Sequence, residues 1–356
     1  MKKSSDIKKT GLNKKIQVII IAIVLLLAVA MVVCFKMFLT NYKKIAKHYV
    51  TAVETCNWQE AFEDMDLPES EFLTENTFAE ANKNETVKEV KDISIVKGSN
   101  PIGKVKGKKT VTAVYSTESD ENLTMDMVLK KEKGGYKITS DGFIYKNGHL
   151  RVPKYTTLYV NGVEVTEGHI ESSDEYFTTY TIPYFYAGNN TIKITGDFIS
   201  DFETILDVNE DDYFKDDLFK ELRISDEAKE ELRQKAKTDV YALVDARNRN
   251  LSFDEILSEN NLKLTEHARV GYEQMCEYYN HIEIMEFYDR IDYSEHAPFN
   301  SDLGFSQYGL TFYEKVKYTS NRSWTGIRDI GETICYTYVE GEWYIYSFDL
   351  YDTVIQ

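Results

Sequence analysis

Hydrophobic and polar positions divide the chain into one long apolar run and many shorter periodic segments. Residues 18–35 read VIIIAIVLLLAVAMVVCF, without a charged side chain, and thirteen of these eighteen residues are Leu, Ile, Val or Phe. On the scale for insertion into bilayers, those side chains favour a spanning helix by about 4–8 kcal/mol. The length and the uniform hydrophobicity both predict a transmembrane helix, which we place at residues 16–39.

The charges before this segment predict its orientation. The positive-inside rule places residues 1–15 in the cytoplasm and the remainder outside the cell. A cleaved signal peptide is the alternative, because Ala28-Val29-Ala30 has the form of a cleavage site. Apolar residues continue for five positions beyond it, which favours an uncleaved anchor in the cell membrane. The lysines that precede the segment are Lys2, Lys3, Lys8, Lys9, Lys14 and Lys15.

Residues 40–148 predict an α+β domain. Apolar residues at helical spacing run through KKIAKHYVTAVETCNWQEAFEDM, and Pro68 then breaks the pattern. A second helix is expected at residues 75–81, with Thr74 as its N-cap. A four-strand antiparallel meander should follow, with a turn at residues 133–135. Its strands are VKEVKDISIV, KKTVTAVYST, LTMDMVLKKE and GYKITSDGFI.

Residues 149–210 have an all-strand pattern that begins at Arg151-Val152-Pro153. Asn161-Gly162 is a strong local signal for a hairpin turn. About sixty residues of this kind predict a small β-sandwich module without room for a deep catalytic pocket. The expected strands are YTTLYVNGVEV, EYFTTYTIPYF, NNTIKITGDF and DFETILDV.

Residues 211–356 predict a second α+β domain. The helical segments are YFKDDLFKELR, SDEAKEELRQKAKTDVYALVDARNRN and LTEHARVGYEQMCEYYNHI. Ser225 suits an N-cap, and Asp226 and Glu227 place negative charge in the first turn, where the helix dipole favours it. Four strands follow, with a turn at Gly341-Glu342 between the last two. They are HIEIMEFYDRIDYS, GLTFYEKVKYTS, GETICYTYVE and EWYIYSFDLY.

Short motifs in the two end domains carry a resemblance. The ending GEWYIYSF, the segment NWQEAF and the hairpin GGYKITSDGF resemble the final strand, a helix and the closing hairpin of the nuclear-transport-factor-2-like fold, a cone of bent sheet around helices. The complete order, with a β-module around LYVNGVEV between the cones, is similar to the TcaA family of Gram-positive cell-envelope proteins, named for teicoplanin resistance. That resemblance implies a role in cell-wall biology or in the response to wall-active antibiotics, exerted by binding.

The chain departs from that family in two respects. Family members often begin with a cytoplasmic four-cysteine zinc ribbon, whereas Cys34 is the first cysteine here, and only one β-module is evident where two are common. We therefore assign no metal site and no cofactor.

The net charge of −17 bears on the partners. Residues 211–356 hold 16 basic and 30 acidic side chains, so the acid excess lies in the membrane-distal half. A surface of that sign repels nucleic acid and other phosphate polymers. We expect the partners to be the membrane together with a wall polymer, a wall precursor or another envelope protein.

Four scattered cysteines are too few for a disulfide scaffold. Cys276 and Cys335 share the last domain and are the candidate pair for one disulfide on the oxidising side of the membrane. The alternative is two buried thiols that behave as small hydrophobic side chains.

Two further groups of residues are candidates for chemistry or binding. Asp292, Tyr313 and Asp349 lie on expected strands of the last sheet, where a cone fold can host proton transfer; the alternative is that they face solvent or line a binding groove. A basic patch in KGSNPIGKVKGKK could contact anionic lipid headgroups or teichoic-acid phosphates, the alternative being a solvated turn. The patch comprises Lys97, Lys104, Lys106, Lys108 and Lys109.

No motif for a nucleophile, a dinucleotide, a phosphate loop or a metalloprotease is present, and we assign no catalytic residue. The sequence thus predicts a non-enzymatic, membrane-anchored binding protein of the bacterial cell envelope. A cone-fold enzyme acting on an envelope metabolite is the alternative, and a deep polar pocket with convergent carboxylate and tyrosine groups would distinguish it.

Overall fold

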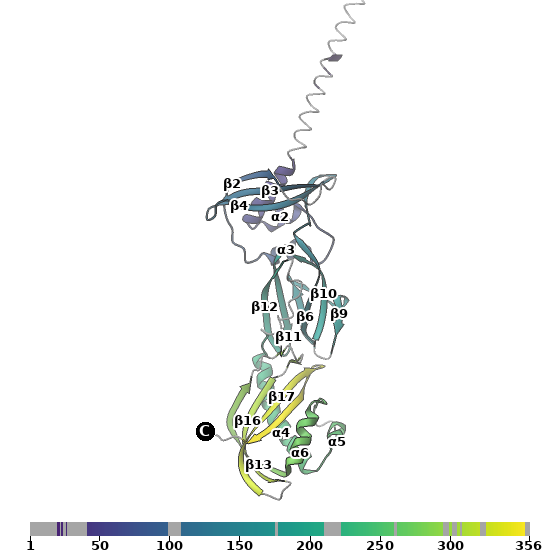
Figure 1. The fold of residues 1–356 in the computed structure, drawn as a ribbon, viewed down its shortest axis with the longest axis vertical. Coiled ribbons are helices and arrows are strands. Elements are labelled where there is room, and N and C mark those ends of the chain that lie inside the picture. The colour runs from purple at the N-terminus through teal and green to yellow at the C-terminus, as the bar shows by residue number, and fades with distance from the viewer. Residues whose placement is uncertain are drawn as a thin grey trace, which may run out of the picture. The chain divides into compact units, whose positions relative to one another are not determined.

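The computed structural model divides into two compact units, Met1–Ile144 and Tyr145–Gln356 (Figure 1). It is an α+β structure. The residues that it describes are 20, 21, 23, 26, 41–98, 108–174, 177–209, 222–259, 262–294, 299–300, 305–306, 308–320 and 325–352.

The expected membrane helix at 16–39 falls almost wholly outside those residues. Its four described members, Ile20, Ile21, Ile23 and Leu26, are helical and exposed. Among the described parts of the chain, no helix is both long enough and apolar enough to cross a membrane.

The first unit combines helices with a five-stranded sheet. Residues 41–54 are helical, followed by α2 (Trp58–Glu63) and α3 (Glu75–Ala81). The sheet has the strand order β1-β5-β4-β3-β2, and β1 runs parallel to β5. Its strands are β1 (Met65–Asp66), β2 (Val90–Lys97), β3 (Lys108–Thr117), β4 (Leu123–Glu132) and β5 (Gly135–Thr139). The expected four-strand meander is confirmed, and the short parallel β1 is an addition to it.

The single helix expected between residue 43 and Pro68 is wrong, because the chain leaves the helix at Cys56. Cys56 adopts a left-handed backbone with φ of 54°. The Cys56 N–H donates to the Val53 carbonyl, and the Asn57 N–H donates to the Ala52 carbonyl. This pair of hydrogen bonds is a Schellman motif, which normally has Gly at the left-handed position, so the sequence carried no stop signal.

The cap of α3 is confirmed. The Thr74 hydroxyl accepts the Thr77 N–H, and the Thr77 hydroxyl in turn accepts the Thr74 N–H, which forms a capping box. Helix α3 has the bounds expected from the sequence.

The second unit begins with two sheets of short strands. One has the order β6-β10-β9 and the other β12-β11-β7-β8. The Asn161-Gly162 hairpin is confirmed, because both residues have positive φ between β7 and β8. Strand β9 was not expected, and β6 starts well before Arg151. The strands are β6 (Ile144–Pro153), β7 (Thr157–Val160), β8 (Val163–Glu164), β9 (Ile170–Ser173), β10 (Phe177–Tyr186), β11 (Gly188–Gly196) and β12 (Ile199–Val208), with a 3-10 helix η1 (Glu167–His169).

The rest of the second unit is a terminal helix-and-sheet layer. Helices α4 (Asp226–Asn248), α5 (Phe253–Glu259) and α6 (Ala268–Tyr278) accompany a sheet of order β13-β16-β17-β18. Ser225 caps α4 as expected, since its hydroxyl accepts the Ala228 N–H. Helix α5 was not expected, and the segment YFKDDLFKELR lies largely outside the described residues. The strands are β13 (Tyr279–Ser294), β16 (Tyr308–Ser320), β17 (Thr325–Val339) and β18 (Glu342–Asp352), and β14 (Phe299–Asn300) pairs with β15 (Phe305–Ser306).

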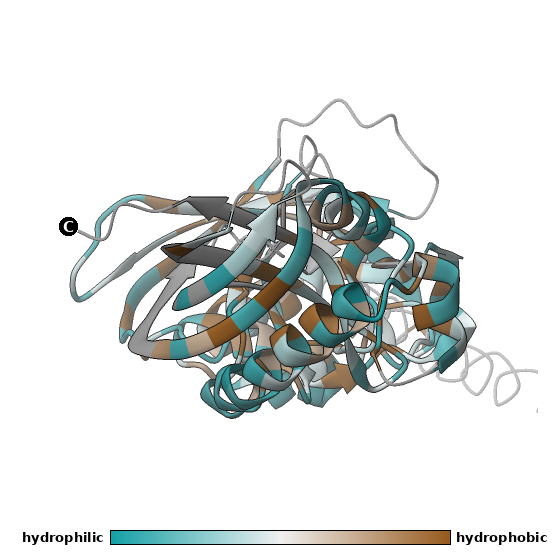
Figure 2. Cartoon of the chain, turned by 90° about the horizontal axis from the view of Figure 1, so that it is seen from below, coloured by the Kyte–Doolittle hydropathy of each residue, from teal (hydrophilic) through white to brown (hydrophobic). Residues whose placement is uncertain are grey.

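The last hairpin turn lies one residue earlier than expected. Its two central residues are Glu340 and Gly341, both with positive φ, and Val339 pairs with Glu342. Figure 2 shows hydrophilic and hydrophobic residues alternating along the helices and strands, which is the pattern of elements buried on one side.

The two parts of the second unit are joined by hydrogen bonds and rings. The Ser225 N–H donates to the Phe198 carbonyl, and the Ser200 N–H donates to the Arg223 carbonyl. The Phe198 ring stacks on Tyr338 with centroids 4.5 Å apart and meets the edge of Trp343 at 6.0 Å. The start of α4 is therefore tied directly to the turn that precedes β12.

Candidate functional site

A buried carboxylate lies between α4 and the terminal sheet. The apolar stripe of α4 is formed by Leu232, Ala236, Val240 and Leu243, all of which are fully buried, and Asp239 occupies the same side of the helix with 4% exposure. An ionised carboxylate in such a position needs charge-assisted hydrogen bonds to be tolerated.

Two donors meet this carboxylate. The Tyr336 hydroxyl of β17 donates to Asp239 Oδ2 at 2.8 Å, and Lys235 Nζ, one helical turn earlier, lies 3.0 Å from the carboxylate. Burial raises the pKa of Asp239, while Lys235 and the Tyr336 hydrogen bond act in the opposite direction. These three residues, Asp239, Tyr336 and Lys235, form the buried trio. The trio connects α4 to the sheet and places a titratable carboxyl group in the core.

Sequence reasoning missed this trio. The available signal was one Asp at a helical position flanked by Ala236, Ala242 and Leu243 at three and four residues, with Lys235 one turn earlier as a possible partner. Its partner Tyr336 lies 97 residues later, and nothing in the sequence identifies it among the 26 tyrosines.

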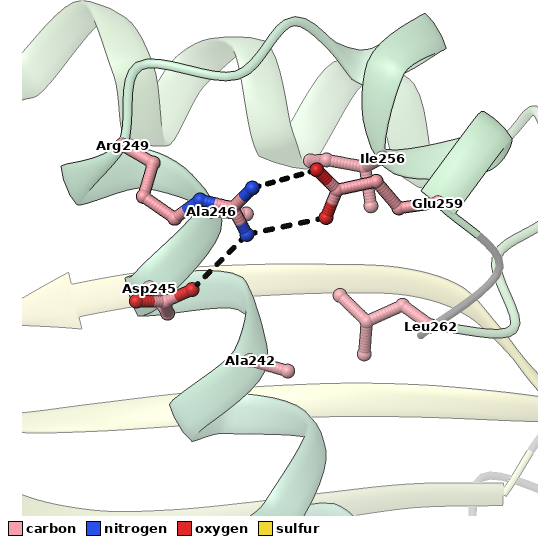
Figure 3. A pocket seen from close by; sticks show the side chains of 7 residues that line it. All are labelled: Ala242, Asp245, Ala246, Arg249, Ile256, Glu259 and Leu262. Atoms are coloured by element: carbon pink, nitrogen blue, oxygen red, sulfur yellow. Dashed lines mark hydrogen bonds and ion pairs between the residues drawn. The ribbon is translucent and has the colours of Figure 1, made fainter.

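A small pocket lies beside the C-terminal half of α4, next to α5 (Figure 3). The Arg249 guanidinium donates to both Glu259 oxygens, at 2.6 and 3.2 Å, and to Asp245 Oδ2 at 3.4 Å. The volume is about 80 Å³, room for two or three water molecules at about 30 Å³ each. Apolar side chains form the remaining wall: Ala242, Ala246, Ile256 and Leu262.

A histidine of the first unit is held between two carboxylates. His48 Nδ1 lies 2.6 Å from Asp64 Oδ2, and His48 Nε2 lies 3.2 Å from Glu60 Oε2. Ionised carboxylates only accept, so both ring nitrogens donate when the imidazole is protonated. The hydrogen bond to Asp64 raises the pKa of His48, and burial raises the pKa of Asp64.

Comparison with known proteins gives no relative. No model of a protein family, no curated protein and no solved structure matches the chain. Arguments about function therefore rest on the residues themselves.

The strand register places the three candidate cone residues on three strands of the terminal sheet. The strand register places Asp292 opposite Thr311, Thr311 opposite Thr333, and Thr333 opposite Asp349. The two aspartates thus stand at opposite ends of one row across four strands, roughly 14 Å apart along the sheet at ~4.8 Å per strand. Tyr313 lies on β16 opposite Gly331. The side chains of these three candidates lie outside the described part of the structure.

The predicted basic patch is described in part. Lys104 and Lys106 lie outside the described residues, and Lys97 is exposed at the end of β2. Lys108 forms an ion pair with Asp141 at 2.5 Å. Lys109 Nζ lies 4.1 Å from the ring centre of Tyr42. The last two lysines therefore have partners within the first unit.

The two cysteines proposed to pair are on different elements. Cys276 is on α6 and Cys335 is on β17, and both are thiols in this structure. Burial raises the pKa of Cys276, which keeps its thiol protonated and weakly nucleophilic at neutral pH. The disulfide between them stays a prediction.

Among the described residues, no group of three or more His, Cys, Asp or Glu side chains could hold a metal ion. The groups described above that could take part in chemistry are the Asp239 carboxylate with its two donors, the charged pocket beside α5, and His48 between its two carboxylates.

Proposed function

We propose that this chain is a membrane-anchored, extracytoplasmic binding protein of a bacterial cell envelope, with two nuclear-transport-factor-2-like domains on either side of a small β-module. The observation that carries the proposal is the uncharged segment 18–35, preceded by six lysines and followed by two folded α+β units. The resemblance to the TcaA family supports a role in wall maintenance or in the response to wall-active antibiotics.

Two features of the second unit favour binding over catalysis. The pocket beside α5, which lies in the described part of the chain, is far smaller than the roughly 300–1,000 Å³ of sites that enclose a small substrate, so it is not itself such a site. The carboxylate of Asp239 is engaged by Tyr336 and Lys235. A group with both donors in place stabilises the fold and is poorly placed to exchange a proton with a ligand.

The location is tested with the full chain carrying a C-terminal epitope tag. It should stay with membranes through an alkaline carbonate wash, and protease added to intact protoplasts should remove the tag. A control in which Leu26→Lys and Val29→Lys interrupt the apolar segment should be released by carbonate. Release of the unaltered chain would contradict the anchor, and protection of the tag would contradict the orientation.

The binding role is tested with the purified chain in detergent against wall precursors, teichoic-acid fragments, divalent cations and glycopeptides. A saturable rise in melting temperature with one of these would identify the ligand class, because a ligand that binds only the folded state stabilises it in proportion to RT ln(1 + [L]/Kd). Turnover of an envelope metabolite, lost when Tyr313→Phe, Asp292→Asn or Asp349→Asn is introduced, would instead favour the enzyme.

A further inference from the structure

We propose that the end of the first unit nearest the anchor docks on anionic lipid headgroups of the bilayer through a cluster of Tyr42, Lys43, Lys44, Lys109 and Lys133, which we name the tyrosine–lysine end. This inference rests on the proposed membrane anchor. It adds a second contact with the bilayer, which would hold the folded unit against the surface.

The centre of the tyrosine–lysine end is a stack of two rings and one ammonium group. The Tyr42 and Tyr136 rings meet edge to face with centroids 5.8 Å apart. Lys109 Nζ lies 4.1 Å from the Tyr42 centroid and 5.4 Å from the Tyr136 centroid. The cation of β3 is therefore fixed beside the first turn of helix 41–54 by cation–π attraction.

Chain length limits how far the Tyr42–Lys109 stack can lie from the end of the expected membrane helix. Tyr42 is three residues beyond residue 39, where the expected membrane helix ends, so it can lie at most about 11 Å from that point even in a fully extended chain. The polar layer of a bilayer is roughly 5–8 Å deep on each side. Because Lys109 touches Tyr42, it is held at the same level, although it follows Tyr42 by 67 positions in the sequence.

Other lysines gather at the same end. Lys43 and Lys44 are exposed on helix 41–54. The β4–β5 turn is close to them, because the Asn41 side-chain amide lies 3.5 Å from the position that a Cβ on Gly135 would take. That turn carries Lys133, which is exposed. Glu132, the acidic residue beside the turn, forms an ion pair with Lys130 at 3.0 Å.

The charge and ring pattern fits a lipid surface. Tyrosine rings are favoured at the membrane–water boundary, where the ring is apolar and the hydroxyl is wet. Each lysine close to an anionic surface contributes about 1 kcal/mol, equivalent to about a fivefold shift in the docking equilibrium. Any three of these lysines together shift the docking equilibrium on the order of a hundredfold at low salt. Screening removes most of this shift above about 0.5 M salt.

The full chain is placed in two kinds of nanodisc, one of pure phosphatidylcholine and one with about one-third phosphatidylglycerol. Amide hydrogen exchange is then measured in the peptides that cover residues 41–49 and 130–137. We expect exchange in both peptides to be at least about fivefold slower in the anionic discs, and the difference to vanish at 0.5 M NaCl. The triple variant Lys43→Gln, Lys44→Gln, Lys109→Gln should lose it.

A matched control replaces three lysines that also lie over aromatic rings, but in the second unit: Lys146→Gln, Lys154→Gln and Lys237→Gln. This variant should keep the full difference. Equal exchange of the unaltered chain in the two kinds of disc would overturn the inference while leaving the anchor intact, since insertion into the discs is scored separately.

Soluble polyphosphate added to phosphatidylcholine discs tests the other phosphate source. Protection by polyphosphate equal to that in anionic discs would overturn the lipid assignment. The salt series on the unaltered chain keeps the test decisive if the triple variant folds poorly, because lipid docking through lysines must weaken steadily with ionic strength.

Discussion

Removal of the Tyr336 hydroxyl offers the sharpest test of the buried trio. The Tyr336 ring is fully buried, so Tyr336→Phe keeps the ring in place and removes the hydroxyl that donates the 2.8 Å hydrogen bond to Asp239. A hydrogen bond to a charged group contributes about 1.5–3 kcal/mol. For a cooperative unit of this size, that loss corresponds to a fall in melting temperature of about 3–12 °C.

The loss should depend on pH. Burial raises the pKa of Asp239, and the Tyr336 hydrogen bond opposes that rise. A carboxyl whose folded pKa is raised contributes stability that is present below its unfolded pKa and is lost as pH rises through the folded pKa. Tyr336→Phe should raise the pKa of Asp239 further, so the destabilisation is larger at pH 7.5 than at pH 4.5.

The assay is urea denaturation of the full chain in detergent at both pH values. Tyr241→Phe is the matched control, because that side chain is 53% exposed and its loss should change the unfolding free energy by less than about 0.5 kcal/mol. The effect of Tyr336→Phe should shrink when Asp239→Asn is already present, since neighbouring groups couple. Equal effects of Tyr336→Phe and Tyr241→Phe would refute the reasoning.

Two further perturbations test other contacts. The hydrogen bond to Asp64 raises the pKa of His48 above 6.5, so its stabilisation is present below that value and lost as pH rises through the folded pKa; His48→Gln should abolish a small gain in melting temperature of the first unit between pH 8 and pH 5.5, whereas His281→Gln should keep it. Gly271→Ala should lower the melting temperature of the second unit, because the added Cβ would lie 2.3 Å from the Phe348 carbonyl oxygen. The strain of about 1–3 kcal/mol then exceeds the helix-propensity gain of about 1 kcal/mol.

Each of these two predictions can be contradicted by one outcome. An unchanged pH response in the His48 variant would mean that the clamp does not distinguish the two protonation states. A higher melting temperature with Gly271→Ala would mean that α6 moves away from β18 at no cost, and that helix propensity decides the outcome.

Local signals explain what could be predicted from the sequence. The caps at Thr74 and Ser225 and the turn at Asn161-Gly162 depend on residues a few positions apart, and each was found in place. The break at Cys56 escaped prediction because a residue other than Gly takes the left-handed position. The register across the terminal sheet also escaped, because pairing of distant strands is decided by packing of the whole domain.

The same reasoning separates the candidate residues. Asp292 and Asp349 were chosen because they lie on strands, but only the register shows that three strand spacings separate them. Lys109 was grouped by its position in the sequence with the other lysines of the basic patch, whereas its place beside Tyr42 follows from a contact between elements distant in the sequence. Residue type identified the chemistry, and tertiary contacts decided which groups meet.

The junction inside the second unit also has a mechanical consequence. Since the Ser225 N–H is bonded to the Phe198 carbonyl and the Phe198 ring stacks on Tyr338, tension applied along the chain would act on these contacts. Such tension would load two hydrogen bonds, of 3.1 and 2.8 Å, together with one ring stack. The β-module would then act as a stiff extension of the terminal domain.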